Sequence, residues 1–256
     1  MSTAFPINTV VVLVAVMIAA GASAWFTLSR ALAQTSLTER SRRAWLWGAA
    51  LVLAVWLLGR LVLTFTTPAS TVVSFYPDTF GFILLGSVIG IGALLVSPEF
   101  RKIVRGAPQT WLIGTQALRL AGFLFLALLD MGRLPAAFAL PAGYGDMAVG
   151  LLALATVGAL LRNKPYARSL AFGVNVLGLL DFVSALATGA SSIGLFAIQL
   201  QAAGVSMAYL NFVLIVPAFG VPLYAVMHVY SLFQLVSSRA VHRGAVSRLA
   251  PHPQAS

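Results

Sequence analysis

A few polar and charged residues interrupt the long apolar stretches of this 256-residue chain, and these are the places where chemistry could occur. A charged side chain at the centre of a lipid bilayer costs about 2.5 to 3.5 kcal/mol, so such residues usually face the interior of a protein and find partners there. The candidates for a ligand-binding site share this position inside, or at the end of, an apolar stretch: Arg60, Arg119, Asp130, Asp146, Asn175, Asp181 and His228.

Matched depth suggests which of these charges pair. Arg119 lies roughly 14 to 15 Å along its predicted span and Asp181 roughly 18 Å along another, at 1.5 Å per residue. Arg119 with Asp181 is therefore the first expected ion pair. Arg60, in the outer half of its span, is expected to pair with Asp130 or Asp146. Such pairs could either lock helices together or line a ligand or ion pathway.

Two spans carry further polar residues. Asn175 and Asp181 flank Gly178, and a glycine lets a neighbouring helix backbone approach closely. His228 lies near the inner end of the last span and could titrate near neutral pH; the alternative is an ordinary hydrogen-bonded contact between helices. In the same span Pro217 and Pro222 remove backbone donors and favour a kink.

The composition excludes several chemistries. The chain has no cysteine, which excludes disulfides, thiolate metal sites and cysteine nucleophiles. A retinal Schiff base needs a lysine within a span, but the lysines, Lys102 and Lys164, lie between predicted spans. A zinc site needs several converging ligands, and His228 is the only histidine in a predicted span. We therefore expect neither a metal nor a cofactor.

The tetrapeptide Gly143-Tyr144-Gly145-Asp146 matches the Gly-x-Gly-Asp pattern of intramembrane aspartyl proteases, which use two carboxylates that share a proton. This match motivates the enzymatic alternative, in which Asp146 forms an acid pair with Asp130 or Asp181. The simpler expectation is a tight turn into the fifth span, with Asp146 close to the positive end of that helix.

The elements that position these residues are predicted to be transmembrane helices. Sixty per cent of the residues are hydrophobic and 9% are charged, against about 25% charged in soluble domains. The expected fold class is all-α: a polytopic transmembrane helical bundle over residues 1–236, followed by a disordered cytoplasmic tail over 237–256. A hydropathy window of about 19 residues predicts seven spans, near 7–28, 44–66, 79–97, 109–130, 144–161, 169–188 and 209–235.

The basic residues predict the orientation. Thirteen of the sixteen lysines and arginines fall on one side of the predicted spans, which the positive-inside rule places in the cytoplasm. The N-terminus is then outside and the C-terminus inside, in a bacterial inner membrane. The net charge of +10 thus reflects orientation, and the expected partners are the lipid bilayer and a small-molecule ligand, with no nucleic acid. The sequence indicates no particular oligomeric state.

The first apolar stretch could also be a cleaved signal peptide, because Ala22-Ser23-Ala24 resembles a signal-peptidase site. No lysine or arginine precedes the stretch, however, and it continues through Trp25, Phe26 and Leu28. We therefore expect a retained helix.

Four stretches make the chain similar to a family of uncharacterised bacterial multi-pass membrane proteins. They run over 116–125 (QALRLAGFLF), 132–150 (GRLPAAFALPAGYGDMAVG), 175–181 (NVLGLLD) and 216–232 (VPAFGVPLYAVMHVYSL). The resemblance covers the chain from the fourth span onward and implies no established activity. It contains Arg119, Asp146, Asn175, Asp181 and His228, the residues already selected by depth.

The leading expectation is a non-enzymatic membrane protein that binds or conducts a small polar or amphipathic ligand. The ligand would occupy a cavity in the outer half of the bundle, lined by Arg119, Asp146, Asn175 and Asp181. The alternatives are the membrane enzyme described above and a scaffold or assembly factor whose buried charges only fix the packing of the helices.

Overall fold

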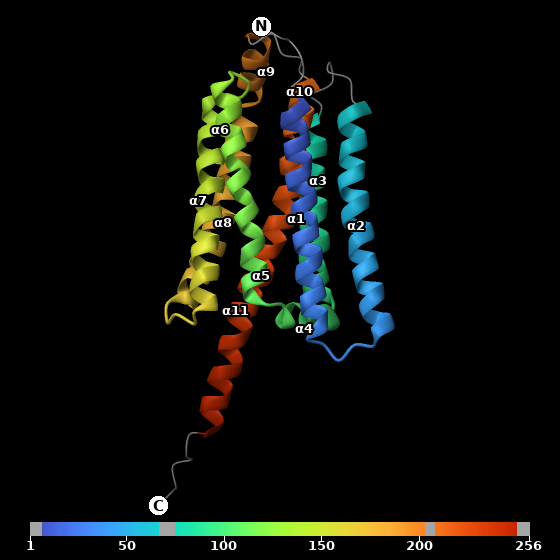
Figure 1. Ribbon diagram of the computed structural model, residues 1–256, viewed down its shortest axis with the longest axis vertical. Coiled ribbons are helices and arrows are strands. Elements are labelled where there is room, and N and C mark those ends of the chain that lie inside the picture. The colour runs from blue at the N-terminus through green and yellow to red at the C-terminus, as the bar shows by residue number, and fades with distance from the viewer. Residues whose placement is uncertain (1–6, 67–74, 203–207, 250–256) are drawn as a thin grey trace, which may run out of the picture.

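The computed structural model describes residues 7–66, 75–202 and 208–249, and these form a bundle of helices (Figure 1). The helical elements, in chain order, are α1 (Ile7–Ala33), α2 (Glu39–Thr66), α3 (Phe75–Val96), α4 (Pro98–Gly106), α5 (Gln109–Gly114), η2 (Thr115–Gly122), α6 (Phe123–Asp130), α7 (Ala136–Leu161), α8 (Ala167–Ser191), α9 (Ile193–Ala202), α10 (Ala208–Val213), η3 (Val216–Gly220) and α11 (Val221–Leu249).

Seven stretches of helix within the described residues are long and apolar enough to cross a membrane. They match the seven predicted spans and lie at Val10–Ala33, Glu39–Thr66, Asp78–Val96, Gln109–Asp130, Ala136–Leu161, Ala167–Ser191 and Leu210–Ser237. The fourth is built from α5, η2 and α6. The seventh runs from Leu210 in α10 through η3 and continues in α11 as far as Ser237. Helix α11 continues to Leu249, into the segment expected to be a tail. The rest of that expected tail, 250–256, lies outside the described residues.

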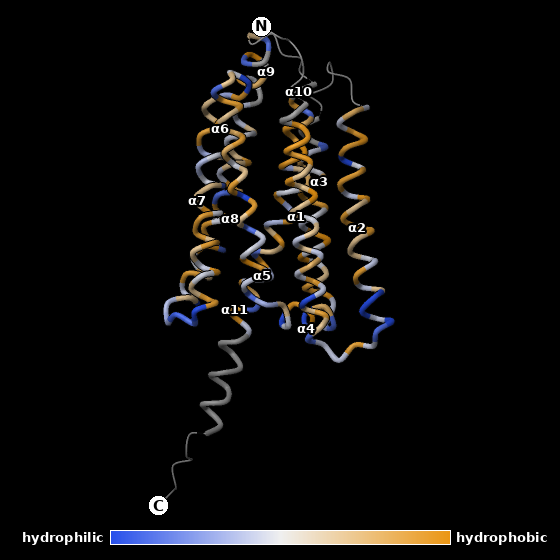
Figure 2. Tube along the Cα trace, viewed as in Figure 1, coloured by the Kyte–Doolittle hydropathy of each residue, from blue (hydrophilic) through white to orange (hydrophobic). Residues whose placement is uncertain are grey.

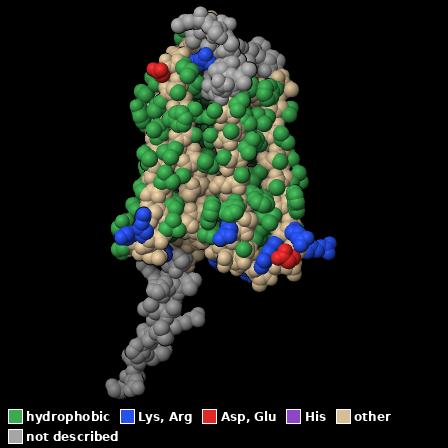
Figure 3. Space-filling model, in the orientation of Figure 1, with side chains coloured by type: hydrophobic (Ala, Val, Ile, Leu, Met, Phe, Trp, Pro, Cys, Tyr) green, Lys and Arg blue, Asp and Glu red, His purple; other side chains and the backbone are tan. Residues whose placement is uncertain are grey.

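The surface of the bundle is a band of apolar side chains. Figure 2 shows hydrophobic residues along most of the length of each long helix, and Figure 3 shows hydrophobic side chains over the middle of the molecule. Lysine and arginine side chains gather on the visible face near the end from which α11 projects (Figure 3). We call this the basic end and the opposite one the N-terminal end, since α1, the first described helix, begins there (Figure 1). The direction in which the bundle sits in a membrane stays a prediction.

Two helix ends carry the backbone cap that reverses the chain. Gly132 after α6 and Asn163 after α7 both have positive φ, +67° and +49°. In each case the next amide reaches back five residues, from Arg133 to the carbonyl of Leu128 at 2.8 Å and from Lys164 to that of Ala159 at 3.0 Å. This is the Schellman pattern, which satisfies carbonyls at the end of a helix.

Small residues let the long helices pack closely. A Cβ added at Gly90 of α3 would lie 2.5 Å from Val226 of α11, and one at Gly86 would lie 2.9 Å from Pro222. This Gly-x-x-x-Gly pair therefore lets α3 pack closely against α11. Helix α2 stands at the edge of the bundle (Figure 1), and Trp56 fastens it there by donating its indole N–H to the carbonyl of Ala218 at 3.0 Å.

Candidate functional site

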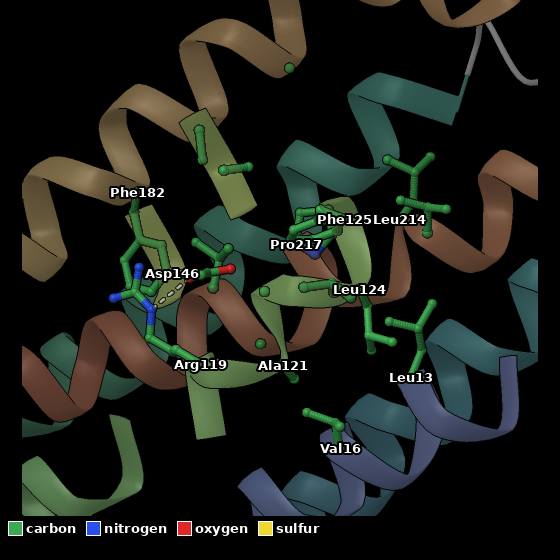
Figure 4. Close-up of a pocket in the computed structure, with 18 of the residues that line it drawn as sticks. Leu13, Val16, Arg119, Ala121, Leu124, Phe125, Asp146, Phe182, Leu214 and Pro217 are labelled. Atoms are coloured by element: carbon green, nitrogen blue, oxygen red, sulfur yellow. Dashed lines mark hydrogen bonds and ion pairs between the residues drawn. The ribbon is translucent and has the colours of Figure 1, made fainter. Parts of the chain in front are cut away.

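The guanidinium of Arg119 lies at the centre of a buried cluster of charges. Its Nε donates to Asp146 Oδ1 at 2.7 Å, and its Nη2 forms an ion pair with Asp181 Oδ2. The ring of Phe182 lies 4.0 Å from the guanidinium carbon, a cation–π contact. The expected pair of Arg119 and Asp181 is confirmed, and Asp146 joins it. Figure 4 shows Arg119, Asp146 and Phe182 together beside the cavity described below.

The remaining terminal nitrogen of Arg119 faces His228. Nη1 lies 3.3 Å from His228 Nε2 and 3.5 Å from the carbonyl of Gly178, to which it donates. A guanidinium can only donate, so His228 Nε2 must accept. The proton of the neutral imidazole is then on Nδ1, which lies 2.9 Å from Asn175 Oδ1 and donates to it.

The hydrogen bonds continue from Asn175 toward the basic end. Asn175 Nδ2 donates to Ser231 Oγ at 2.6 Å, and Gln109 Nε2 donates to the same hydroxyl oxygen at 2.5 Å. The chain from Arg119 to Gln109 thus passes through η2, α11, α8 and α5. These hydrogen bonds hold the imidazole and the guanidinium in one orientation, because each nitrogen of the His228 ring has a fixed role: Nε2 accepts from Arg119 and Nδ1 donates to Asn175.

Two glycines provide the room for the two carboxylates. A Cβ added at Gly122 of η2 would lie 2.5 Å from the Cβ of Asp146, and one at Gly145 of α7 would overlap with Asp181 Oδ1. Real Cβ atoms essentially never approach other atoms so closely. The carboxylates can therefore meet Arg119 only because no side chain stands at either position.

Gly178 plays the same part for the imidazole. A Cβ there would overlap with His228 Nε2 and lie 3.1 Å from Arg119 Nη1. The room expected at Gly178 for close packing therefore holds two polar side chains. The spacing of small residues along one span does not show which groups of a neighbouring helix will fill such a place.

The predicted turn at Gly143–Asp146 was also wrong, because these residues lie inside α7. This helix begins at Ala136, directly after Pro135 at its N-cap, so Asp146 lies roughly 15 Å from its first residue at 1.5 Å per residue. Pro141 is contained within the helix. Proline is tolerated in membrane helices when neighbouring helices hold the backbone in place. The additional turns carry Asp146 to the level of Arg119.

Arg60 and Asp130 are not part of this cluster. Arg60 is fully buried and donates from Nη2 to the carbonyl of Asn211 at 3.1 Å, and the carboxylate whose charge acts on it is that of Asp78. Asp130 is exposed at the end of α6. The expected pairing of Arg60 with Asp130 or Asp146 was therefore wrong, since Asp146 binds Arg119. Of the two expected acid pairs, the structure brings together only Asp146 and Asp181, with the guanidinium binding both.

A cavity of about 90 Å³ extends from the cluster toward the N-terminal end. Its polar end is formed by Arg119, Asp146 and Tyr224, whereas Asn175 and Asp181 do not line it. The rest of the wall is almost entirely apolar and comes from α1, η2, α6, α7, α8, α9, α10, η3 and α11, with Leu214 between α10 and η3. Figure 4 shows part of this wall, including Leu13, Val16, Leu124, Phe125, Leu214 and Pro217.

Tyr224 is the residue of the cavity that sequence reasoning missed. Its side chain is 4% exposed, and its hydroxyl has no hydrogen-bond partner within the part of the chain that is described. Because tyrosines within a predicted span are common, the available signal was its position four residues after Gly220, the end of a Pro-x-x-Gly segment that begins at Pro217.

Two of the helices that build the cavity are irregular beside it. The eight residues of η2, which carry Arg119, form a 3₁₀ helix, and those of η3 form a π-helical turn around Pro217. A 3₁₀ run of more than three or four residues is uncommon, and π turns frequently occur at functional sites. The irregularity predicted from Pro217 and Pro222 thus takes the form of a π turn.

Residues 79–236 match a protein family described as "Domain of unknown function (DUF8737)". The match covers Arg119, Asp146, Asn175, Asp181 and His228, the five polar residues that meet in the cluster. This chain belongs to the DUF8737 family. Comparison with curated proteins and with solved structures gave no match.

In this DUF8737 protein, α1 and α2 precede the matched segment and add to it in two ways. Helix α1 contributes Leu13, Val16 and Met17 to the wall of the cavity beside Arg119. Helix α2 encloses a second, larger groove of about 740 Å³ against α1, α3, α4 and α11. Among the described residues that line this groove, Glu99 is the only charged one. We therefore place the candidate site at the smaller cavity, where buried charges meet an apolar wall.

Proposed function

We propose that this protein binds a small amphipathic molecule in the cavity beside Arg119, with the polar group of the ligand at Asp146 and Tyr224. The apolar part of the ligand would lie among the side chains of α1, α6 and η3. The main support is the hydroxyl of Tyr224. It lies at the polar end of an apolar cavity, is buried, and lacks a hydrogen-bond partner among the described residues.

The energetics of the cavity support a ligand with one polar end. A buried donor or acceptor without a partner costs about 1–3 kcal/mol, which a ligand group bonded to Tyr224 would recover. Asp146 offers a second contact, because only its Oδ1 has a hydrogen-bond partner within the described residues. The volume of about 90 Å³ is several times the space of roughly 10–15 Å³ that one water needs.

The arrangement favours binding over conduction. On the side toward the basic end, the cavity stops at the guanidinium of Arg119, which is held by two carboxylates and by the hydrogen-bonded His228. A molecule that entered from the N-terminal end would therefore stop at this cluster.

Native mass spectrometry of the purified protein tests the proposal, because a retained ligand appears as added mass. Ala121 lines the cavity, so Ala121→Leu should fill it and remove the added mass. Ala148 is exposed on the outside of α7, and Ala148→Leu is the matched control that should retain the ligand. Tyr224→Phe removes only the hydroxyl, so it should weaken retention of the ligand while leaving the shape of the cavity nearly unchanged. A wild-type protein that carries no bound molecule other than bilayer lipid, or an added mass that survives Ala121→Leu, would refute the proposal.

We further propose that the protein resides in a bacterial inner membrane, with the N-terminal end outside and the basic end in the cytoplasm. The support is the seven apolar helices together with the arginines and lysines gathered at one end of the bundle.

A further inference from the structure

The cluster around Arg119 contains more acid than base. A single guanidinium lies between the carboxylates of Asp146 and Asp181. With both acids ionised, these three side chains carry one negative charge in excess, in the interior of a bundle whose outer surface is apolar. A buried charge without compensation is unfavourable at low dielectric constant, so one further positive charge is needed.

The other groups that face the carboxylates do not supply this charge. From α11, His228 directs Nε2 at a guanidinium N–H, so it accepts a hydrogen bond there and is neutral, and Tyr224 is a neutral phenol. From α8, Asn175 is an uncharged amide. Helix α1 presents only apolar side chains to the cavity. The missing charge is therefore either a proton on the carboxylate pair or a cation that reaches it.

The cavity gives a cation this access. Asp146 lines it with a side chain that is 17% exposed, and its Oδ1 is engaged by Arg119, which leaves Oδ2 for another group. The rings of Phe125, Phe138 and Phe196 also line the cavity. Aromatic faces attract cations and also accommodate an apolar chain.

We propose that the cavity takes a cationic amphiphile, an apolar body with one ammonium-type head, and that this head replaces a proton held by the Asp146–Asp181 pair when the cavity is empty. The inference rests on the proposed function, since it assigns a charge to the ligand of that same cavity. In the exchange, the O–H bond of the protonated carboxyl breaks, its electron pair stays on the carboxylate, the proton passes to water, and the cationic head takes its place.

The exchange has a measurable signature. A permanent cation competes with a proton for one site, so its affinity should rise by up to tenfold for each unit of pH over the range in which the pair is protonated. A neutral molecule of the same length has no such competition. Each bound cation should also release up to one proton into a weakly buffered solution containing an indicator dye.

Octyltrimethylammonium, which does not titrate, and 1-octanol are suitable probes, with the full chain in phosphatidylcholine nanodiscs and empty nanodiscs as the blank. Binding measured at pH 6, 7 and 8 should strengthen with pH for the cation and stay constant for octanol.

Ala121→Leu should abolish the binding of both probes. Asp181→Asn leaves Arg119 with Asp146 and removes the excess charge, so it should abolish the pH dependence and proton release while octanol still binds. Asp130→Asn, at the exposed end of α6, is the control that should change neither.

The outcomes separate the two proposals. If octanol binds in the cavity but the cation shows no dependence on pH and releases no proton, the exchange is refuted and the binding function stands. If neither probe binds, or Ala121→Leu leaves both unaffected, the cavity is not the site and both proposals fail. A pH dependence that persists in Asp181→Asn would also refute the assignment of the proton to the carboxylate pair.

Discussion

Oδ1 of Asp181 occupies the place where a side chain at Gly145 would begin. The two residues belong to adjacent helices, α7 and α8, and the absence of a side chain on one is what lets the carboxylate of the other reach Arg119. In the sequence, Gly145 stands directly before Asp146, so one position of α7 carries an acid of the cluster and its neighbour makes room for the second acid.

Gly145→Ala should therefore displace Asp181 and destabilise the protein by about 1–3 kcal/mol, the usual cost of overpacking a filled interior. Thermal unfolding in detergent measures the effect. Gly173→Ala, on the surface of α8 with no atom within 4 Å of an added Cβ, is the control and should leave the melting temperature unchanged or slightly raised. Equal melting temperatures for the two variants would contradict the packing described for Gly145.

Arg119→Gln should be the most damaging single substitution in the cluster. It leaves two carboxylates without their guanidinium, and breaking a buried ion pair in this way costs about 3–5 kcal/mol. The triple variant R119Q/D146N/D181N has no net charge in the cluster and should regain much of the lost stability. Melting temperature and yield of monodisperse protein are the measurements.

The same triple variant also distinguishes a scaffold from a binding protein. If the charges only fix packing, a triple variant that folds should behave as the wild type in every assay. If they form a ligand site, it should fold but fail to retain the molecule seen by native mass spectrometry, or to bind the cationic probe.

Asn175→Ala should leave His228 Nδ1 without its acceptor, at a cost of about 1–3 kcal/mol for an unpaired buried donor. The ¹⁵N spectrum of histidine-labelled protein should show the wild-type His228 protonated on Nδ1 and not on Nε2, and this pattern should change in the variant. Ser184→Ala, at an exposed position of the same helix, should leave the spectrum as it was. A wild-type His228 protonated on Nε2 would contradict the direction assigned to the hydrogen bonds.

Gly90→Ala should separate α3 from α11, because the added Cβ would lie 2.5 Å from Val226. The expected destabilisation is about 1–3 kcal/mol, and Val226→Ala in the same chain should restore part of it by removing the opposing methyl groups. Gly92→Ala has no atom within 4 Å of the added Cβ and is the control. If Val226→Ala restores none of the stability lost in Gly90→Ala, the destabilisation does not come from the contact between these two residues.

The orientation can be read from reporter fusions. Green fluorescent protein fused after Ser256 should fluoresce, and alkaline phosphatase at the same position should be inactive, since the positive-inside rule places the basic end in the cytoplasm. The opposite result would reverse the orientation of the bundle.

The spans follow from the sequence alone because the requirement that determines them is local. A helix that crosses a membrane must be apolar for about 20 residues, and any such stretch can be recognised without knowing its neighbours. The same reasoning identified which polar residues must find partners, and Arg119, Asp146, Asn175, Asp181 and His228 do meet. Their depth was enough to pair Arg119 with Asp181.

The remaining partners were decided by the tertiary structure. Asp146 reaches Arg119 because α7 begins at Ala136 and contains Pro141, and a proline by itself does not show whether neighbouring helices will hold a helix together through it. The contact of His228 with Arg119 depends on how α8 and α11 are rotated about their axes, since only that rotation brings His228 over Gly178. Hydrophobicity along a chain determines how deep a residue lies, whereas the direction in which its side chain points is set by contacts between helices far apart in the sequence.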